Sequence, residues 1–171
     1  MPNRLAQLCS PAALALALAF SSWAAQAEGP KTVPSPSANQ GGVIAVPSAY
    51  GMIDTVDRLQ KAIAGKGILF FGAVNQGELA AVSGVPGVRP SVLLTFGNPP
   101  LGTQLLAVNQ QAGLDWPVRM LVYVDSPGHV MIAWTDFAWI ANRHGLGGLD
   151  PQLEMAAEVA ASVAAAAKKQ L

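Results

Sequence analysis

Residues 91–144 have the sequence SVLLTFGNPPLGTQLLAVNQQAGLDWPVRMLVYVDSPGHVMIAWTDFAWIANRH, and this segment indicates the fold class. Its first part, Ser91 to Phe96, has four large apolar residues around Thr95 and does not alternate. Such continuity predicts a central strand that is buried on both faces. Gly97 ends the strand, so a change of element is expected immediately after it.

A helix and a strand hairpin follow. Asn98 suits the N-cap of a helix and Pro99 its first position, and the apolar spacing carries this helix to about Gln111. Val118 to Val124 alternates between two faces, which predicts a strand with one buried face. The next residues, Asp125 to Gly128, place Pro and Gly at the centre of a type II turn, so Val130 to Thr135 is expected to return as the hairpin partner.

The segment closes with a short helix. Asp136 is a good N-cap, Phe137 and Ile140 form an apolar side that is expected to cover the sheet, and Gly145 ends the helix.

Upstream of this segment, the pattern predicts two more strands and a helix. Val43 to Val46 and Ile68 to Val74 are strand candidates, and Glu78 to Val82 is a short helical turn. Met52, Val56, Leu59 and Ile63 recur at spacings of four, three and four, which indicates an amphipathic helix that ends at the glycines 65 and 67.

Downstream, Asp150 and Pro151 begin a long C-terminal helix. Its alanine-rich seam is expected to pack on the same domain and comprises Leu153, Ala156, Ala160, Val163 and Ala167. The whole pattern predicts an α+β fold: a single compact domain over residues 43–149, with about five strands in a largely antiparallel sheet and flanking helices, plus the C-terminal helix over 150–171.

Four motifs in this order resemble the domain-of-unknown-function 302 family. They are the helix from Met52 that ends at Gly67, the LLTFGNP run with Gly102-Thr103 beyond it, the VRMLVYVD strand, and WTDFAWIANRHG. The resemblance covers about Gly41 to Leu149. It implies a sheet flanked by helices and a homodimer, with no agreed biochemical activity.

One position departs from the family pattern. Members often carry Ile-Asp-His after the second strand, whereas this chain has Val74-Asn75-Gln76. If the Asp and His act chemically in relatives, this chain retains only an amide pair that can form hydrogen bonds but cannot ionise.

The N-terminal 27 residues are typical of a secretory signal peptide. Arg4 precedes an apolar run from Ala12 to Phe20, and Ala25-Gln26-Ala27 is a cleavage site. The run is shorter than the roughly 20 residues that span a bilayer, so no membrane span is expected after cleavage. Residues 28–42, rich in Pro, Ser and Gly, are predicted to be a disordered linker, and the mature protein is predicted to be periplasmic.

Composition excludes several classes of function. Cys9, the single cysteine, lies in the predicted signal peptide, so the mature chain has no thiol for a disulfide or for redox chemistry. The chain has ten basic and ten acidic residues, and this balance gives no basic surface for nucleic acid. Two histidines without a ligand motif predict no metal site, and no cofactor is predicted.

Catalytic candidates lie around the last short helix. Asp136, His144 and Arg119 have the chemistry of an acid, a base and an anion clamp, with Arg143 as an alternative to Arg119. The structural interpretation is favoured, because Asp136 suits an N-cap and the two basic residues suit the last helical turn.

Candidates for ligand binding lie elsewhere in the same segment. Gly97 and Asn98 precede a helix N-terminus that can hold an anion, although two prolines remove donors there. Tyr123, Trp134 and Trp139 could line an apolar pocket, but such aromatics are more often part of a core or a subunit interface.

Two hypotheses follow. The first is a non-enzymatic exported module that binds a small ligand or an envelope protein as a homodimer. The second is a small hydrolase or isomerase that uses Asp136 and His144.

Overall fold

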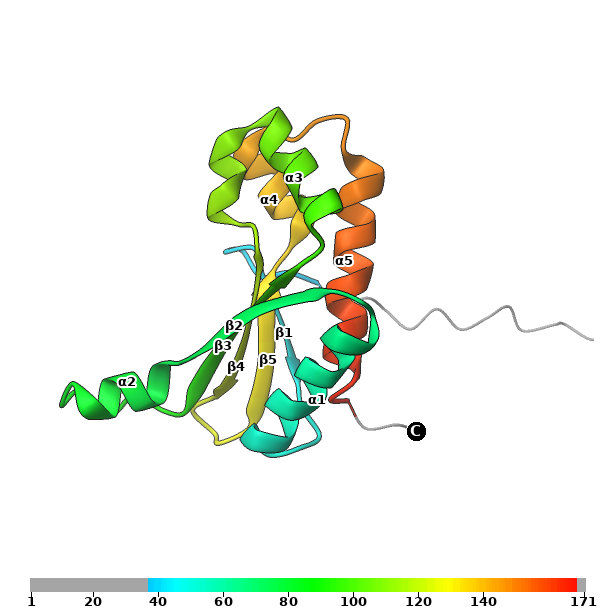
Figure 1. The fold of residues 1–171 in the computed structure, drawn as a ribbon. Helices are drawn as coiled ribbons and strands as arrows, with labels where there is room; N and C mark the ends of the chain where they lie inside the picture. The colour runs from blue at the N-terminus through cyan, green and yellow to red at the C-terminus, as the bar shows by residue number, and fades with distance from the viewer. Residues whose placement is uncertain (1–36, 169–171) are drawn as a thin grey trace, which may run out of the picture. The chain divides into compact units, whose positions relative to one another are not determined.

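A computed structural model describes residues 37–168 of the protein (Figure 1). The predicted signal peptide, residues 28–36 of the predicted linker and the last three residues of the C-terminal segment lie outside this range. Within the predicted linker, the Asn39 side chain accepts hydrogen bonds from the backbone N–H groups of Gly41 and Val43, so a closed turn leads into the first strand.

The sheet has five strands in the order β1-β5-β4-β3-β2, and every neighbouring pair is antiparallel. The α+β fold and the β4–β5 hairpin predicted from the sequence are therefore confirmed. The strands are β1 (Val43–Pro47), β2 (Leu69–Asn75), β3 (Ser91–Gly97), β4 (Val118–Val124) and β5 (Val130–Thr135).

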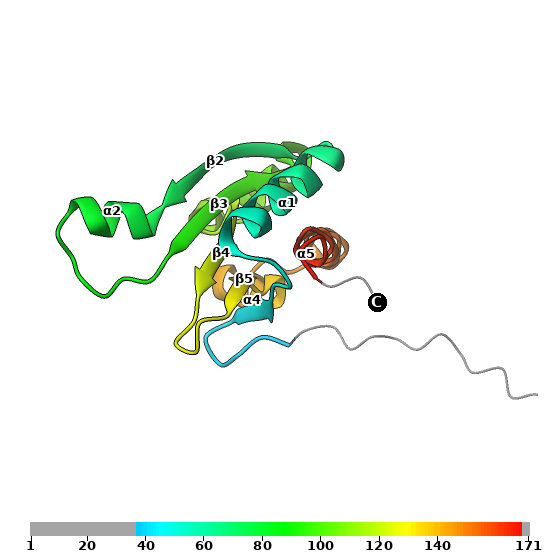
Figure 2. The ribbon, with the colours of Figure 1, turned by 90° about the horizontal axis from the view of Figure 1, so that it is seen from below.

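Five α-helices and one 3-10 helix complete the described chain: α1 (Met52–Gly65), α2 (Gln76–Val82), α3 (Pro99–Val108), η1 (Gln110–Leu114), α4 (Phe137–His144) and α5 (Asp150–Ala165). Figure 2 shows α1 and α5 on one side of the sheet, and α2 beyond the ends of β2 and β3. The α3, η1 and α4 group lies at one end of the sheet (Figure 1).

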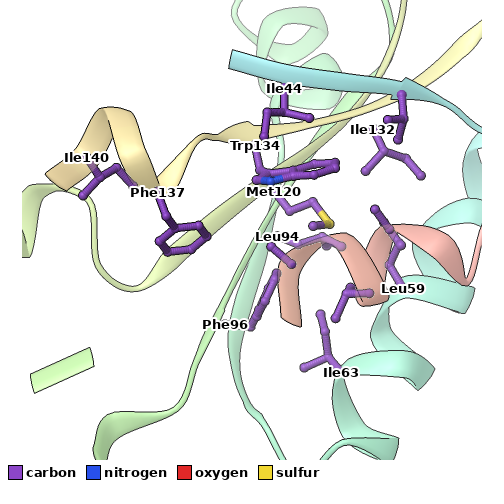
Figure 3. Close-up of a cluster of buried hydrophobic side chains, with 14 of the residues drawn as sticks. Ile44, Leu59, Ile63, Leu94, Phe96, Met120, Ile132, Trp134, Phe137 and Ile140 are labelled. Carbon is purple, nitrogen blue, oxygen red and sulfur yellow. The ribbon is translucent and has the colours of Figure 1, made fainter. Parts of the chain in front are cut away.

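The core lies between the sheet and the two helices α1 and α5 (Figure 3). Alternate strand residues point toward it, and Leu59 and Ile63 of α1 meet them. The C-terminal helix packs on its own domain, as predicted, through Ala160 and Val163, both fully buried. The strand side chains of this core are Ile44, Val46, Leu94, Phe96, Met120, Val122, Ile132 and Trp134.

The prediction for the third strand was wrong in one respect. β3 is not the central strand, since β4 holds that place, and only one face of β3 is buried. Leu94 and Phe96 are buried whereas Leu93 and Thr95 remain partly exposed. The continuous apolar sequence misled because Leu93, on the partly exposed face, is itself apolar and joins Val92 and Leu94 in an unbroken run.

The helix ends differ from prediction in three details. Asn98 occupies the N-cap position of α3, but its side chain forms no capping hydrogen bond. α3 ends at Val108, because Asn109 adopts an extended backbone and caps η1 instead. Asp150 lies inside the first turn of α5, whose N-cap is Leu149.

The α4 helix begins and ends as predicted. The Asp136 carboxylate accepts a hydrogen bond from Ala138 N at 3.3 Å, and Gly145 takes the left-handed conformation at φ +62° that favours glycine. The apolar side of α4 joins the core through Phe137 and Ile140.

Candidate functional site

A buried carboxylate lies where η1 passes into β4. The side chain of Asp115 is 2% exposed and uses both of its oxygens. Arg119 Nη2 donates to Oδ1 at 2.7 Å, and Arg143 Nη1 donates to Oδ2 at 3.0 Å. His144 Nε2 lies 2.6 Å from the same Oδ2 and donates to it in the tautomer that is protonated there.

This ion cluster of Asp115, Arg119, Arg143 and His144 joins the start of β4 to the end of α4. A buried carboxylate is tolerated only when charged or hydrogen-bonding partners compensate its lost hydration. Asn109 adds a further link, since its side-chain amide donates to the His144 backbone carbonyl at 2.9 Å. The arrangement therefore fixes the η1 and α4 segments against each other.

The buried carboxylate of the ion cluster has no substrate-sized cavity beside it. The void beside Asp115 and Arg119 has a volume of about 10 Å³, the space of a single water molecule at most. Arg119 and His144 do converge, but on Asp115 and not on Asp136, which caps α4. The acid, base and clamp of the enzyme hypothesis thus do not surround a shared pocket.

An apolar cavity of about 270 Å³ lies at the same end of the sheet. Its size is close to the lower limit of small-molecule sites, about 300 Å³. The ends of β3 and β4 and the helices α3, α4 and α5 supply most of its wall, and Lys66 and Asn98 add the charged and amide groups. The lining residues are Lys66, Ile68, Phe96, Gly97, Asn98, Leu101, Gly102, Leu105, Trp116, Val118, Phe137, Met155, Ala156 and Val159.

Two glycines give Trp116 its place in this wall. A Cβ atom on Gly102 would lie 1.9 Å from Trp116 Nε1, and one on Gly97 would lie 3.0 Å from the same atom. The indole therefore packs directly on backbone that only glycine leaves bare. Phe71 of β2 also packs against the indole edge-on, with ring centroids 6.1 Å apart.

The predicted ligand-binding residues separate into two groups. Gly97 and Asn98 line the cavity. Trp134 is buried in the core, Trp139 packs over Gly42 beneath Arg143, and Tyr123 lies beside a different surface depression near Arg89 and Pro90. The three aromatics do not line the cavity.

Sequence reasoning missed Trp116, Lys66 and Asp115. Trp116 and Asp115 lie between the predicted helix and strand, where no element was predicted, and Lys66 lies between two helix-ending glycines. The one available signal was the pair of glycines, 97 and 102, on either side of a helix start, because closely approached backbone favours glycine.

The departure from the family pattern has a structural role. The Asn75 side chain accepts from Glu78 N at 3.0 Å and is the N-cap of α2, and the Gln76 amide oxygen accepts from the Ser91 hydroxyl at 3.0 Å. An aspartate can also serve as an N-cap, but only the Asn75 amide can donate to Glu78 Oε2, which it does at 3.2 Å.

The hairpin turn holds a second Asp–His pair. His129 Nδ1 lies 3.3 Å from Asp125 Oδ2, and the His129 side chain is 70% exposed. Desolvation raises the pKa of the Asp125 carboxyl, but the hydrogen bonds and charge of His129, together with the Gly128 N–H, outweigh it and leave the pKa below its ordinary value. Between residues 37 and 168, no group of three or more His, Cys, Asp or Glu residues could hold a metal ion.

Fold and site together define a class: a small α+β domain with an open antiparallel sheet and an apolar cavity at one end. The chain matches the family described as "Domain of unknown function DUF302" over residues 44–169. It belongs to this family.

A solved structure agrees with that assignment. The fold is similar to the crystal structure of an uncharacterized conserved DUF302 protein from Bacillus stearothermophilus, with a TM-score of 0.68 and 19% identity over 74% of this chain and 98% of that one. The chain is also 35% identical, over 114 residues, to proteins named "Fluoride-specific ion channel FluC 1" from Brucella suis and Brucella abortus. These matches cover 67% of this chain but 44% and 42% of the relatives, so the chain spans less than half their length.

Proposed function

We propose that the protein is an exported binding module that holds a small, largely apolar molecule with an acidic group in the cavity beside Trp116. The observation that carries this proposal is the cavity itself. Its wall comes from five elements and is built around an indole that rests on two glycines.

The chemistry of the wall selects the class of molecule. Most lining side chains are aliphatic or aromatic, which favours an apolar body. Lys66 supplies a cation and Asn98 an amide, so a carboxylate or sulfonate at one end of the molecule finds a complementary charge. No bond-breaking chemistry is proposed, because the ionisable groups of the ion cluster have no substrate-sized space beside them.

Export is part of the proposal. The signal-peptide pattern of the first 27 residues supports a periplasmic location. Relatives named as ion channels support a setting at the cell envelope. Among the helices of residues 37–168, none is long and apolar enough to cross a membrane, and we propose no channel activity for this chain. Fractionation of cells that express the full sequence, with N-terminal sequencing of the product, tests export and cleavage after Ala27.

Binding is tested with decanoate as a probe and decanol as its neutral counterpart. Protein purified from expression of the full sequence is titrated with each by calorimetry and by tryptophan fluorescence. We expect both to bind, with decanoate the tighter. Ala156→Leu, which fills the cavity, is expected to weaken both by about tenfold or more, equal to about 1.4 kcal/mol.

Two matched controls locate the effect. Ala157→Leu changes the neighbouring residue of α5, which lines a different depression, and is expected to leave binding unchanged. Lys66→Gln is expected to weaken decanoate and not decanol, whereas Lys61→Gln, on an exposed pair with Asp57, changes neither. The proposal fails if neither probe binds, or if Ala156→Leu binds both as tightly as the unaltered protein.

A homodimer, which the family resemblance implies, also belongs to the proposal.

A further inference from the structure

An arm of the chain projects beyond the sheet. The arm, residues 78–89, contains most of α2 and the loop that leads back to β3, and Figures 1 and 2 both show it extending away from the ends of β2 and β3. Its base is fixed to β3, since the Ser91 hydroxyl donates to the Gln76 side chain at 3.0 Å. Beyond this base α2 has no buried residue, and residues 81–90 are all exposed. The arm is therefore a protrusion that its own domain leaves uncovered.

The sequence of the arm separates apolar from charged residues. It reads ELAAVSGVPGVR, with Glu78 and Arg89 at its two ends. The ten residues between them, here called the tip, carry one polar side chain, that of Ser83. Exposed apolar side chains that lie together mark an interaction surface. The large aliphatic residues of the tip recur at every third position and are Leu79, Val82, Val85 and Val88, with exposed fractions of 54%, 77%, 53% and 48%.

The end of α2 pairs backbone groups within the tip. Val85 N donates to the Ala80 carbonyl at 2.9 Å. Gly84 adopts the left-handed conformation, at φ +70°, that ends a helix without steric cost for glycine. Pro86, which follows, has no backbone N–H that would need a partner. Paired backbone groups lower the cost of moving a segment out of bulk water.

A surface depression of about 330 Å³ lies at the base of the arm, beside Arg89 and Tyr123. Arg89 Nε donates to the Val124 carbonyl at 2.9 Å, which fixes the guanidinium there. Among residues 37–168, the two terminal nitrogens of this guanidinium have no hydrogen-bond acceptor. A guanidinium with available nitrogens complements phosphate oxygens. Tyrosine is typical of the level of lipid headgroups, where its ring meets apolar chains and its hydroxyl meets water.

We infer that the arm inserts into the surface of a lipid bilayer, with the aliphatic side chains of the tip among the acyl chains and the Arg89 guanidinium at the phosphates. The order of groups along the arm matches the layers of that surface, since the apolar tip is flanked by charged residues. Amphipathic segments bind in this way about 5–10 Å deep, without a spanning helix. The inference goes beyond the proposed function, because it uses neither the cavity nor a homodimer.

Charge and shape favour lipid over a protein partner. A protein interface surrounds its apolar core with a rim of hydrogen bonds, but the tip offers one polar side chain. A protein groove covers one face of a helix, whereas the exposed aliphatic residues of the tip come from both α2 and its loop. Acyl chains surround a protruding tip on every side and need no hydrogen bonds from it.

The charges at the base of the arm suit a zwitterionic lipid. Arg89 complements the phosphates, which lie outside the acyl chains. The Glu78 carboxylate accepts from the Asn75 amide at 3.2 Å and is exposed, so it stays at the level of the headgroups. Because these two opposite charges balance, binding is not expected to require anionic lipid.

The test is flotation of the protein, produced from the full sequence, with phosphatidylcholine vesicles. We expect the protein to float with them, and phosphatidylglycerol in the vesicles is expected to change the affinity by less than about fivefold, the effect of one basic residue. Val82→Asp on α2 is expected to weaken binding by about tenfold or more, because a carboxylate at the tip loses its hydration. Ile53→Asp on α1, where the side chain is 85% exposed, is the matched control and is expected to bind like the unaltered protein.

A second tip variant, Val85→Asp, places the charge in the loop, where it disturbs no helix, and is expected to weaken binding similarly. Circular dichroism checks that each variant is folded. Arg89→Gln is expected to weaken binding by about fivefold, less than the tip variants. Excess inorganic phosphate is expected to leave vesicle binding unchanged.

Protein that does not float with the vesicles overturns the inference. Unweakened binding by both folded tip variants overturns it too, because binding would then come from another part of the chain, such as residues 1–36. Displacement by inorganic phosphate would identify a soluble anion as the ligand of Arg89 and exclude docking on lipid. Ala156→Leu separates the arm from the proposed ligand site, because it is expected to weaken decanoate binding and to leave flotation unchanged.

Discussion

The ion cluster around Asp115 and the apolar cavity beside Trp116 lie at the same end of the sheet and share Val118 and Phe137 in their walls. The cluster is closed, because each oxygen of its carboxylate is occupied and the space beside it holds one water molecule at most. The cavity, in contrast, contains open space, and its wall is mostly apolar. The difference indicates that the ionisable groups link parts of the fold, whereas the apolar cavity is the surface at which we propose ligand binding.

The largest expected effect on stability comes from the ion cluster. Asp115→Ala leaves three cationic or hydrogen-bonding side chains without their shared acceptor and is expected to lower the free energy of unfolding by about 3–5 kcal/mol. Urea denaturation measures the loss. Asp57→Ala, which removes one exposed partner of Lys61, is the control and is expected to cost less than about 1 kcal/mol. Equal losses in the two variants would show that the cluster does not stabilise the fold.

A single added methyl group is expected to disturb the wall of the apolar cavity. Gly102→Ala places a Cβ within the Trp116 indole and forces it to move, which is expected to cost about 1–3 kcal/mol and to change the fluorescence of the protein. Gly65→Ala is the matched helical control, since no atom lies within 4 Å of its added Cβ. A stable Gly102→Ala protein with unchanged emission would contradict the packing of Trp116 on this glycine.

Two alanines on α5 compare the cavity with the core directly. Ala156→Leu fills empty space and is expected to raise the stability by about 0.5–2 kcal/mol. Ala160→Leu, one turn further along, is fully buried and is expected to cost about 1–3 kcal/mol through overpacking. Thermal unfolding of both variants measures the difference. If both lose stability equally, the space beside Ala156 is not open in solution.

Local sequence patterns predicted the helices and strands well. They predicted the ion cluster and the apolar cavity poorly. The α4 helix was predicted from Asp136 to Gly145, since capping and glycine stops act within a few residues. The burial of β3 was misjudged because one apolar residue on its partly exposed face, Leu93, gives the same unbroken apolar run as a strand buried on both faces. Asp115 meets Arg143 and His144 only through the fold, 28 and 29 residues apart, so no spacing rule could have joined them.

The residues that line the apolar cavity show the same limit of local sequence patterns. Gly97 and Asn98 were predicted as ligand-binding candidates from a strand-to-helix turn, and they do line the cavity. Met155 and Ala156 belong to the C-terminal helix and reach the cavity only because α5 packs back on the domain. Trp116 lay in a segment without a periodic pattern, and its contact with Gly102 depends on tertiary packing.

The smallest expected effect comes from the exposed Asp–His pair, which contrasts with the buried one. The pKa of Asp125 lies below its ordinary value of 3.8, so its stabilising contribution is fully present above that value and is lost as the pH falls through the lowered pKa. Asp125→Asn is therefore expected to be slightly less stable than the unaltered protein at neutral pH. The difference is expected to shrink to nothing in strong acid, where both side chains are uncharged.

Thermal midpoints of the two proteins across an acid pH series measure this, with Asp54→Asn as a control for an exposed carboxyl on α1. A difference that stays constant from neutral pH to strong acid would show that the charge of the Asp125 carboxylate does not stabilise the turn, since an amide keeps the acceptor for His129 N and removes only the charge. A difference that disappears identifies the charge itself as the stabilising factor. The turn would then show that a partly exposed carboxylate contributes only a small, pH-dependent term, whereas the buried Asp115 contributes a structural link.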